Sequence, residues 1–210
     1  MMELFTIGHS NHSIEDFIAL LNQHQITAVV DVRSHPYSRY LPHFNKAPLE
    51  AVLKQAKIYY VFLGRELGAR REELGCYDSL GKALYDRIAK TDLFSQGIQR
   101  LLNGMKNHRI ALMCAEKDPL TCHRTILVCH QLKPYNLSIS HILPQGKLES
   151  QAELDQRLLQ KYNPQPKPAE FLQLSLFTQT VSEPIKTVSL AESYTRQGYE
   201  IAYQKDVQYS

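Results

Sequence analysis

Several features that mark other classes of protein are missing from this sequence of 210 residues. No apolar run approaches the length of about 18 residues that a membrane-spanning helix needs, so we expect no membrane span. The first residues, MMELFTIGHS, lack the basic start and long apolar stretch of a signal peptide. The GxGxxG and P-loop motifs that bind dinucleotides and nucleoside triphosphates are also absent. We therefore expect a cytoplasmic protein without the common nucleotide-binding fingerprints.

Strong charge and a cysteine framework are lacking as well. The formal net charge is only +3, which is too weak by itself to indicate nucleic-acid binding. The chain has four cysteines, and in a cytoplasmic protein these are expected to be free thiols rather than disulfides. The composition is 43% hydrophobic and 21% charged, which is ordinary for a globular chain that can bury a core.

Apolar strand-like segments alternate with segments of helical periodicity. The predicted strands are residues 3–9, 27–33, 57–64, 109–116 and 137–143. Such alternation predicts right-handed βαβ units. We therefore expect an α/β fold, a Rossmann-like three-layer sandwich whose mostly parallel sheet has about five strands, with 3-2-1-4-5 as a candidate order.

The predicted helices fill the gaps between these strands. They are residues 13–25, 48–56, 80–90, 93–106, 122–132 and 150–162, with Ser13 and Ser150 as N-caps. The segment NPQPKPAE, residues 163–170, then has the proline content of a linker. We expect an α/β domain over residues 1–162, followed by a linker and C-terminal tail over 163–210. The tail segment SLAESYTRQGYEIAYQ could add a short helix.

Polar and ionisable residues gather where the predicted strands end. The strand ends read GHSNHS, DVRSHPYSR, LGRELG and CAEKDPLTCHR. Ligands of open α/β sheets bind at the carboxyl ends of the strands. In the expected order the first and fourth strands are neighbours, so His9 and Ser10 should face Cys114 and Glu116.

One interpretation of these strand ends is an anion-binding site. A helix that starts near Thr121 would present free N–H groups and its positive dipole end to a phosphate. Arginine forks and hydroxyls suit the same ligand, and aromatic residues in HPYSRYLPHFN suit stacking on nucleobases. The alternative is that the arginines are solvated or paired with acids such as Asp31 and Glu66. The candidate substrate-binding residues are Ser10, Arg33, Ser38, Arg39, Arg65, Thr121, His123 and Arg124.

A second interpretation concerns acid–base and thiol chemistry. A carboxylate just beyond a strand, such as Glu116 or Asp31, could act as a general base, and His9 could share this role. Alternatively, Glu116 pairs with Arg124. Cys122 at a helix start beside His123 could be a thiolate nucleophile, with Cys114 as its resolving partner. The competing explanation is that both cysteines only pack in the core. The candidate catalytic residues are Glu116, His9, Asp31 and Cys122.

A third interpretation is a zinc site. The candidate ligands, all of residue types that bind zinc, are Cys114, Cys122, His123, His9 and His12. Their spacing matches no common zinc pattern, and an adjacent cysteine and histidine, such as Cys122 and His123, rarely both bind the same ion. We therefore predict no metal ligands and no cofactor.

The motifs TIGHS, DVRSHPYSR, FN, ELG and LMCAEKDPLTCHR, with a late RQGYEIAY, resemble those of the domain of unknown function family DUF488. The resemblance covers most of residues 4–145 and departs from the family pattern at Gly68-Ala69, where the family has two glycines. It implies an α/β fold and marks the strand-end motifs as the family's shared core.

Together these features favour an enzyme that acts on a phosphate-bearing substrate, a nucleotide or a nucleic acid, with hydrolysis or N-glycosidic cleavage as the candidate reactions. One alternative is a non-catalytic module that binds nucleic acid or a nucleotide. A weaker alternative is a thiol-dependent redox or sulfur-transfer protein. The sequence leaves the oligomeric state open.

Overall fold

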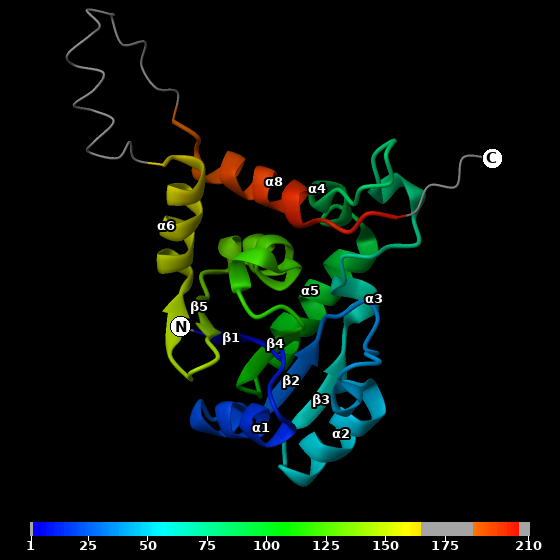
Figure 1. The fold of residues 1–210 in the computed structure, drawn as a ribbon, viewed down its shortest axis with the longest axis vertical. Coiled ribbons are helices and arrows are strands. Elements are labelled where there is room, and N and C mark those ends of the chain that lie inside the picture. Colours follow the sequence, from blue (N-terminus) through cyan, green and yellow to red (C-terminus); the bar gives the residue numbers. More distant parts are fainter. Residues whose placement is uncertain (1, 165–186, 206–210) are drawn as a thin grey trace, which may run out of the picture.

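The sheet of the computed structural model has six strands in the order β3-β2-β4-β1-β5-β6, within described residues 2–164 and 187–205. Neighbouring strands from β3 to β5 pair in parallel, and β6 pairs with β5 in the antiparallel direction. Helices cover both faces of the sheet (Figure 1), so the predicted three-layer α/β fold is confirmed. The strands are β1 (Glu3–Gly8), β2 (Ala28–Asp31), β3 (Tyr59–Phe62), β4 (Ile110–Cys114), β5 (Ser138–Ile142) and β6 (Leu148–Ser150).

The expected order 3-2-1-4-5 was wrong in one respect: β4 lies between β2 and β1. Every residue of β4 is buried, as befits a strand with neighbours on both sides and helices on both faces. The expected contact between the first and fourth strands is confirmed, with Gly8 opposite Cys114. The short strand β6 was not predicted.

The described chain contains the following helices, which include several short ones. The α-helices are α1 (Ile14–Gln23), α2 (Lys46–Gln55), α3 (Gly64–Leu67), α4 (Tyr85–Ile88), α5 (Asp92–Gly104), α6 (Gln151–Tyr162) and α8 (Leu190–Ile201). Single 3-10 turns are η1 (Pro42–Phe44), η2 (Leu74–Cys76), η3 (Pro119–Thr121) and η5 (Lys133–Tyr135), and η4 (Arg124–Cys129) is a π-helix.

Two apolar layers hold the helices to the sheet. On one face, α1 and α2 bury Phe17 and Leu49 against Phe5 of β1. On the other face, α5 and η4 bury Phe94 and Leu127 in the cluster that includes Leu4 of β1. Successive residues of β1 therefore enter opposite layers, as the pleat of a strand requires.

A third apolar cluster joins α6, η4 and α8. Its buried members from these three helices are Leu154 and Leu158 of α6, Ile126 of η4 and Tyr194 of α8. In Figure 1, α6 stands beside the sheet edge and α8 crosses above η4 toward α4. The last described residues thus pack against the α/β core, while 165–170 of the predicted linker lie outside the described residues.

Local signals account for where several helices begin. Ser13 and Thr91 each accept a hydrogen bond from a first-turn N–H, and Ser150 forms a capping box with Glu153. The prediction of a helix over 80–90 was wrong in its first half. Ala83 instead donates its N–H to Tyr203 O in an extended segment, so only Tyr85–Ile88 is helical.

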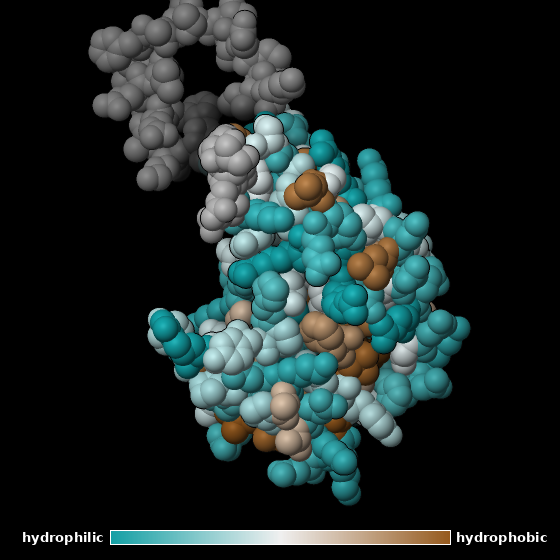
Figure 2. All heavy atoms as spheres, turned by 90° about the vertical axis from the view of Figure 1, so that its right-hand side faces the viewer, coloured by the Kyte–Doolittle hydropathy of each residue, from teal (hydrophilic) through white to brown (hydrophobic). Residues whose placement is uncertain are grey.

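The surface adds little that is distinctive. The face on the right-hand side of Figure 1 is mostly hydrophilic, and its apolar side chains form small separate groups (Figure 2). Within residues 2–164 and 187–205, no helix combines the length and apolarity needed to cross a membrane.

Candidate active site

The site lies at the carboxyl ends of β1, β4 and β2, where a loop from β4 crosses β1. His9 and Ser10 continue the ladder by donating their N–H groups to Cys114 O and Ala115 O, at 2.9 and 2.8 Å. The crossing leaves no room beside Gly8, because a Cβ there would lie 1.9 Å from Glu116 O. Glycine at this position is therefore what allows the loop to carry Glu116 over the end of β1.

Arg124 holds this loop in place through buried hydrogen bonds. Its side chain is fully buried and donates to Glu116 O at 2.7 Å and to Thr6 Oγ1 at 3.4 Å. The sequence suggested Arg124 as a ligand for phosphate or a partner of the Glu116 carboxylate. In the structure its guanidinium faces backbone oxygens of the loop instead.

A second chain of buried contacts links Asp31, Arg33 and His9. The Asp31 carboxylate accepts from Arg33 Nε and Nη2 at 2.9 and 2.7 Å and from the Tyr60 hydroxyl at 2.8 Å. Arg33 Nη2 also donates to Phe44 O at 2.8 Å, while Nη1 lies 3.2 Å from His9 Nε2. Asp31 thus orients Arg33 from inside the protein.

His9 is held neutral in this environment. Its ring stacks on Phe44 with 4.3 Å between centroids, and Nδ1 lies 3.0 Å from Ser10 O. Burial, together with the charge of Arg33, lowers the pKa of His9 to about 4. A neutral ring with Nδ1–H donating to Ser10 O leaves Nε2 as the acceptor that faces Arg33.

Cys114, Glu116, Cys122 and His123 form a compact cluster beside these residues. Glu116 Oε2 lies 3.0 Å from the Sγ atoms of both cysteines, and Cys114 Sγ lies 3.6 Å from His123 Nδ1. His123 Nε2 lies 3.0 Å from Val32 O, which accepts its proton and turns Nδ1 toward the thiols. The Arg124 N–H points at Cys122 Sγ at 3.4 Å.

The two thiols in this cluster are not equivalent. Burial raises the pKa of Cys114 well above its usual value. Burial also opposes ionisation of Cys122, but its contact with Cys114 and the charge of Arg124 together lower its pKa well below the usual value. Loss of hydration, and then the neighbouring Cys122, raise the pKa of Glu116.

The segment after the cluster is also unusual. The expected helix over 122–132 contains the π-helix η4, which starts at Arg124 immediately after the clustered Cys122 and His123. Single π-helical turns are rare and are found often at functional sites. Asp118 caps the turn that begins at Pro119 by accepting the Leu120 N–H at 2.9 Å.

A pocket of about 490 Å³ opens over these residues and unites many of the predicted ones. Seven predicted site residues line it: His9, Ser10, Arg33, Ser38, Glu116, Thr121 and His123. Asp31, Cys122 and Arg124 are buried and do not line it. Arg65 and Arg39 are exposed outside its lining, and Arg39 donates to the neighbouring Tyr40 hydroxyl.

The sequence patterns did not identify three residues that line the pocket, Arg70, Ile201 and Tyr203. Arg70 lines it, donates its N–H to Ser34 Oγ at 2.9 Å, and lies over the Tyr203 ring at 4.3 Å from the centroid. Tyr203 and Ile201 come from the C-terminal segment. The late motif RQGYEIAY was the available signal, because it contains Ile201 and Tyr203.

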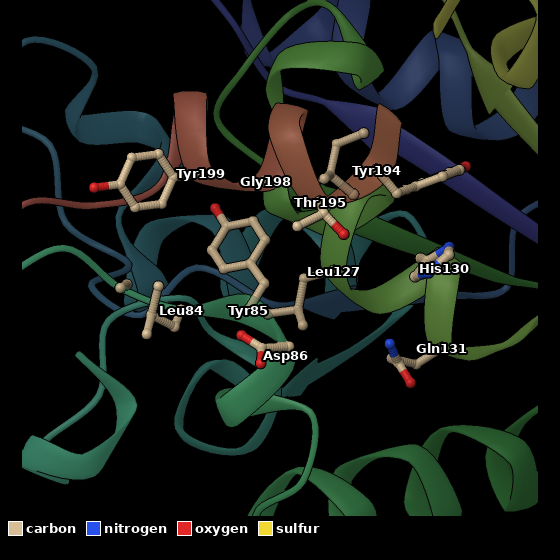
Figure 3. A pocket seen from close by; sticks show the side chains of 12 residues that line it. Leu84, Tyr85, Asp86, Leu127, His130, Gln131, Tyr194, Thr195, Gly198 and Tyr199 are labelled. Carbon is tan, nitrogen blue, oxygen red and sulfur yellow. The ribbon is translucent and has the colours of Figure 1, made fainter. Parts of the chain in front are cut away.

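Tyr85 separates this pocket from a smaller cavity of about 140 Å³ beneath α8, because it lines both. Figure 3 shows the Tyr85 ring directed toward α8 near Gly198 and Thr195. A Cβ on Gly198 would lie 3.2 Å from the Tyr85 ring, so glycine allows this close approach. Across the same cavity His130 stacks on Tyr194 at 4.0 Å.

The fold and site define a class: a parallel α/β protein with an ionisable cluster and polar pocket at its strand ends. The model of the family "Domain of unknown function DUF488" matches residues 13–130, and the chain belongs to this family. No curated protein and no solved structure matches the sequence.

Proposed function

We propose that this protein is an enzyme that acts on a phosphate-bearing substrate, a nucleotide or a nucleic acid, in the pocket above β1, β2 and β4. The observation that carries the proposal is the pocket lining: two arginines and several hydroxyls stand beside the ionisable cluster. Folding alone does not require these groups to converge at the strand ends.

The two arginines are suited to an anion in different ways. Arg33 is fixed by Asp31 and Phe44 O, so it would bind with little loss of side-chain freedom. Arg70 is exposed, and in the described residues no carboxylate pairs with it. Guanidinium forks match the geometry of phosphate oxygens, and Ser10, Ser38 and Thr121 add hydroxyl donors.

Aromatic side chains in the lining favour a nucleotide over a simple phosphate ester. Tyr37 is 73% exposed, and Tyr37, Tyr85 and Tyr203 all line the pocket. Nucleobases stack on such rings, and each stacked base contributes about 1–3 kcal/mol to single-strand binding.

The neighbouring cluster favours turnover over simple binding. Cys114, Glu116 and His123 line the same pocket as Arg33 and Arg70. Carboxylate and imidazole groups beside an anion-binding wall are what a group-transfer or hydrolytic step needs. A purely binding surface gains nothing from them.

Binding and turnover can be tested separately on the full chain. Calorimetric titrations with pyrophosphate, ATP and a short single-stranded DNA should show salt-sensitive binding. Arg70→Gln should weaken that binding about tenfold, corresponding to about 1.4 kcal/mol. Arg196→Gln, which changes an exposed arginine on α8 outside the pocket, is the matched control.

Product analysis on the same nucleotides and nucleic acids tests catalysis. Glu116→Gln should abolish product formation while pyrophosphate binding persists. Binding without products in the wild-type chain would favour the non-catalytic alternative, and an absence of binding by every phosphate probe would refute the proposal.

A further inference from the structure

We infer that one divalent metal ion of the zinc class binds to the cluster of Cys114, Glu116, Cys122 and His123. Its four ligand atoms are Cys114 Sγ, Cys122 Sγ, His123 Nδ1 and a Glu116 carboxylate oxygen, which all lie within 4.8 Å of one another. The inference depends on the cluster alone and holds whether or not the pocket binds phosphate.

Three of the separations are within a few tenths of an ångström of those around a tetrahedral ion, and all the ligand atoms lie within 4.8 Å of one another. Zinc bonds of about 2.0–2.3 Å place ligand atoms roughly 3.3–3.8 Å apart around a tetrahedron. Cys114 Sγ and His123 Nδ1 are 3.6 Å apart, which is within this range. The two contacts from Glu116 to the thiols, at 3.0 Å, need to lengthen by only a few tenths of an ångström.

The donor types select the class of metal. Two thiolates and an imidazole suit a borderline or soft ion such as Zn²⁺, whereas Mg²⁺ and Ca²⁺ prefer oxygen ligands throughout. A single carboxylate is compatible with the zinc class. Because Cys122 is buried while the other three residues line the pocket, the ion would lie in the pocket wall.

The surrounding protein already orients the ligands. The contact of His123 Nε2 with Val32 O fixes the ring so that Nδ1 faces the thiols. Metal-bound histidines almost always make such an outer contact. The Arg124 N–H directed at Cys122 Sγ would stabilise a thiolate there. Cys114 ends a central strand, so its position is also rigid.

A metal site explains the cluster better than the two alternatives. A redox pair would need Cys114 and Cys122 but neither an oriented imidazole nor a carboxylate between the thiols. Simple core packing would not direct Glu116 Oε2 at both sulfurs. The unmatched sequence spacing is no objection, because β4, the crossing loop and the start of η4 bring the ligands together in space.

Metal titration of the full chain tests the inference. After reduction and chelation, the protein should take up one equivalent of Zn²⁺ in competition with a chromophoric chelator. Co²⁺ in its place should give tetrahedral d–d bands and thiolate-to-cobalt charge-transfer absorption. Failure to take up Co²⁺, or a Co²⁺ spectrum without the thiolate band, would overturn the site.

Variants assign the ligands. Cys114→Ser, Cys122→Ser and His123→Gln should each weaken Zn²⁺ binding more than about 100-fold, since even outer-contact changes cost 10–100-fold. Cys76→Ser, at a buried thiol outside the cluster, is the control and should keep one equivalent of Zn²⁺.

Glu116→Gln separates loss of a ligand from loss of the fold. Glutamine has the size and shape of glutamate, so the change should leave the circular dichroism spectrum unchanged. Weaker Zn²⁺ binding and an altered Co²⁺ spectrum would support the four-ligand site, whereas an unchanged affinity and spectrum would refute it. Pyrophosphate binding by the same samples is read separately, so failure of one proposal does not imply failure of the other.

Discussion

Arg33 and Arg124 show how two buried arginines at one site can serve different purposes. The Arg124 guanidinium donates a hydrogen bond to the carbonyl oxygen of Glu116 and so fixes the loop that carries this cluster residue. Arg33 is paired with Asp31 and keeps Nη1 beside His9 at the pocket. Burial of a charge is costly unless it is compensated: Arg33 is paired with the Asp31 carboxylate, whereas the Arg124 guanidinium is hydrogen-bonded to backbone and hydroxyl oxygens.

At Gly8 the close backbone crossing gives a prediction about stability. Gly8→Ala should lower the free energy of unfolding by about 3 kcal/mol, because the new Cβ meets the rigid carbonyl of Glu116 and the loop must move. Urea unfolding followed by circular dichroism measures this change.

Gly75→Ala provides the control for this substitution. A Cβ at Gly75 has no atom within 4 Å, so its effect should stay within about 0.5 kcal/mol of zero. Equal effects at the two glycines would contradict the steric argument.

Seven of the residues that line the pocket could be located from sequence, but their roles could not. The strand-end patterns brought His9, Ser10, Arg33 and Glu116 to one edge because parallel strands share that edge. Whether an arginine faces solvent or a carbonyl depends on contacts far apart in sequence. Arg124 meets Thr6 across 118 positions, for example, and no local pattern encodes this.

At the scale of elements, α8 connects the C-terminal segment to the site. Gln197 is 1% exposed and donates to Leu120 O at 2.8 Å in the loop between the cluster residues. Its Oε1 accepts from Lys161 Nζ at 2.6 Å and from the Tyr162 hydroxyl at 3.0 Å on α6. The pattern predicted a short helix in the tail, but its docking depends on these distant partners.

Removing this connection should loosen α8. Gln197→Ala leaves Leu120 O without its buried donor, so it should cost about 1–3 kcal/mol in unfolding free energy. Hydrogen exchange should become faster in α8 and around Leu120.

Arg196→Ala changes the adjacent exposed position, whose partner is Glu192 one turn earlier. Loss of such a surface pair should cost less than about 0.5 kcal/mol. If Arg196→Ala accelerated exchange as much as Gln197→Ala, the buried contact would not be what holds α8.

At the scale of the whole molecule, sequence predicted the fold class better than the strand order. Five strands and their helices follow from local apolar patterns. The position of β4 between β2 and β1 depends on pairing between strands that are far apart in the sequence. Because β1 and β4 are both almost entirely buried, their local patterns do not show which of the two lies beside β2. Interchanging the two retains their mutual contact, so the expected closeness of His9 to Cys114 and Glu116 did not depend on the full strand order.

Buried neutral histidines should make the stability of the whole chain sensitive to acid. His141 is fully buried, with Nδ1 2.9 Å from Thr6 Oγ1. Burial, and then the charges of Arg124 and Arg157, lower its pKa to about 3 against the opposing effect of Asp155. The unfolded chain takes up a proton near pH 6.5, whereas the folded chain does not until about pH 3. The stabilisation from neutral His141 is therefore complete above pH 6.5 and is lost as the pH falls toward 3.

His141→Asn should remove this contribution to the pH dependence. Between pH 6 and 4 the wild-type unfolding free energy should fall by about 1.4 kcal/mol per pH unit more steeply than that of the variant, which corresponds to one proton. Urea unfolding at a series of pH values measures both slopes. His35→Asn, at an exposed histidine, should leave the wild-type slope in place. Parallel slopes for wild type and His141→Asn would contradict the argument, because they would show that the buried His141 takes up its proton without unfolding the core.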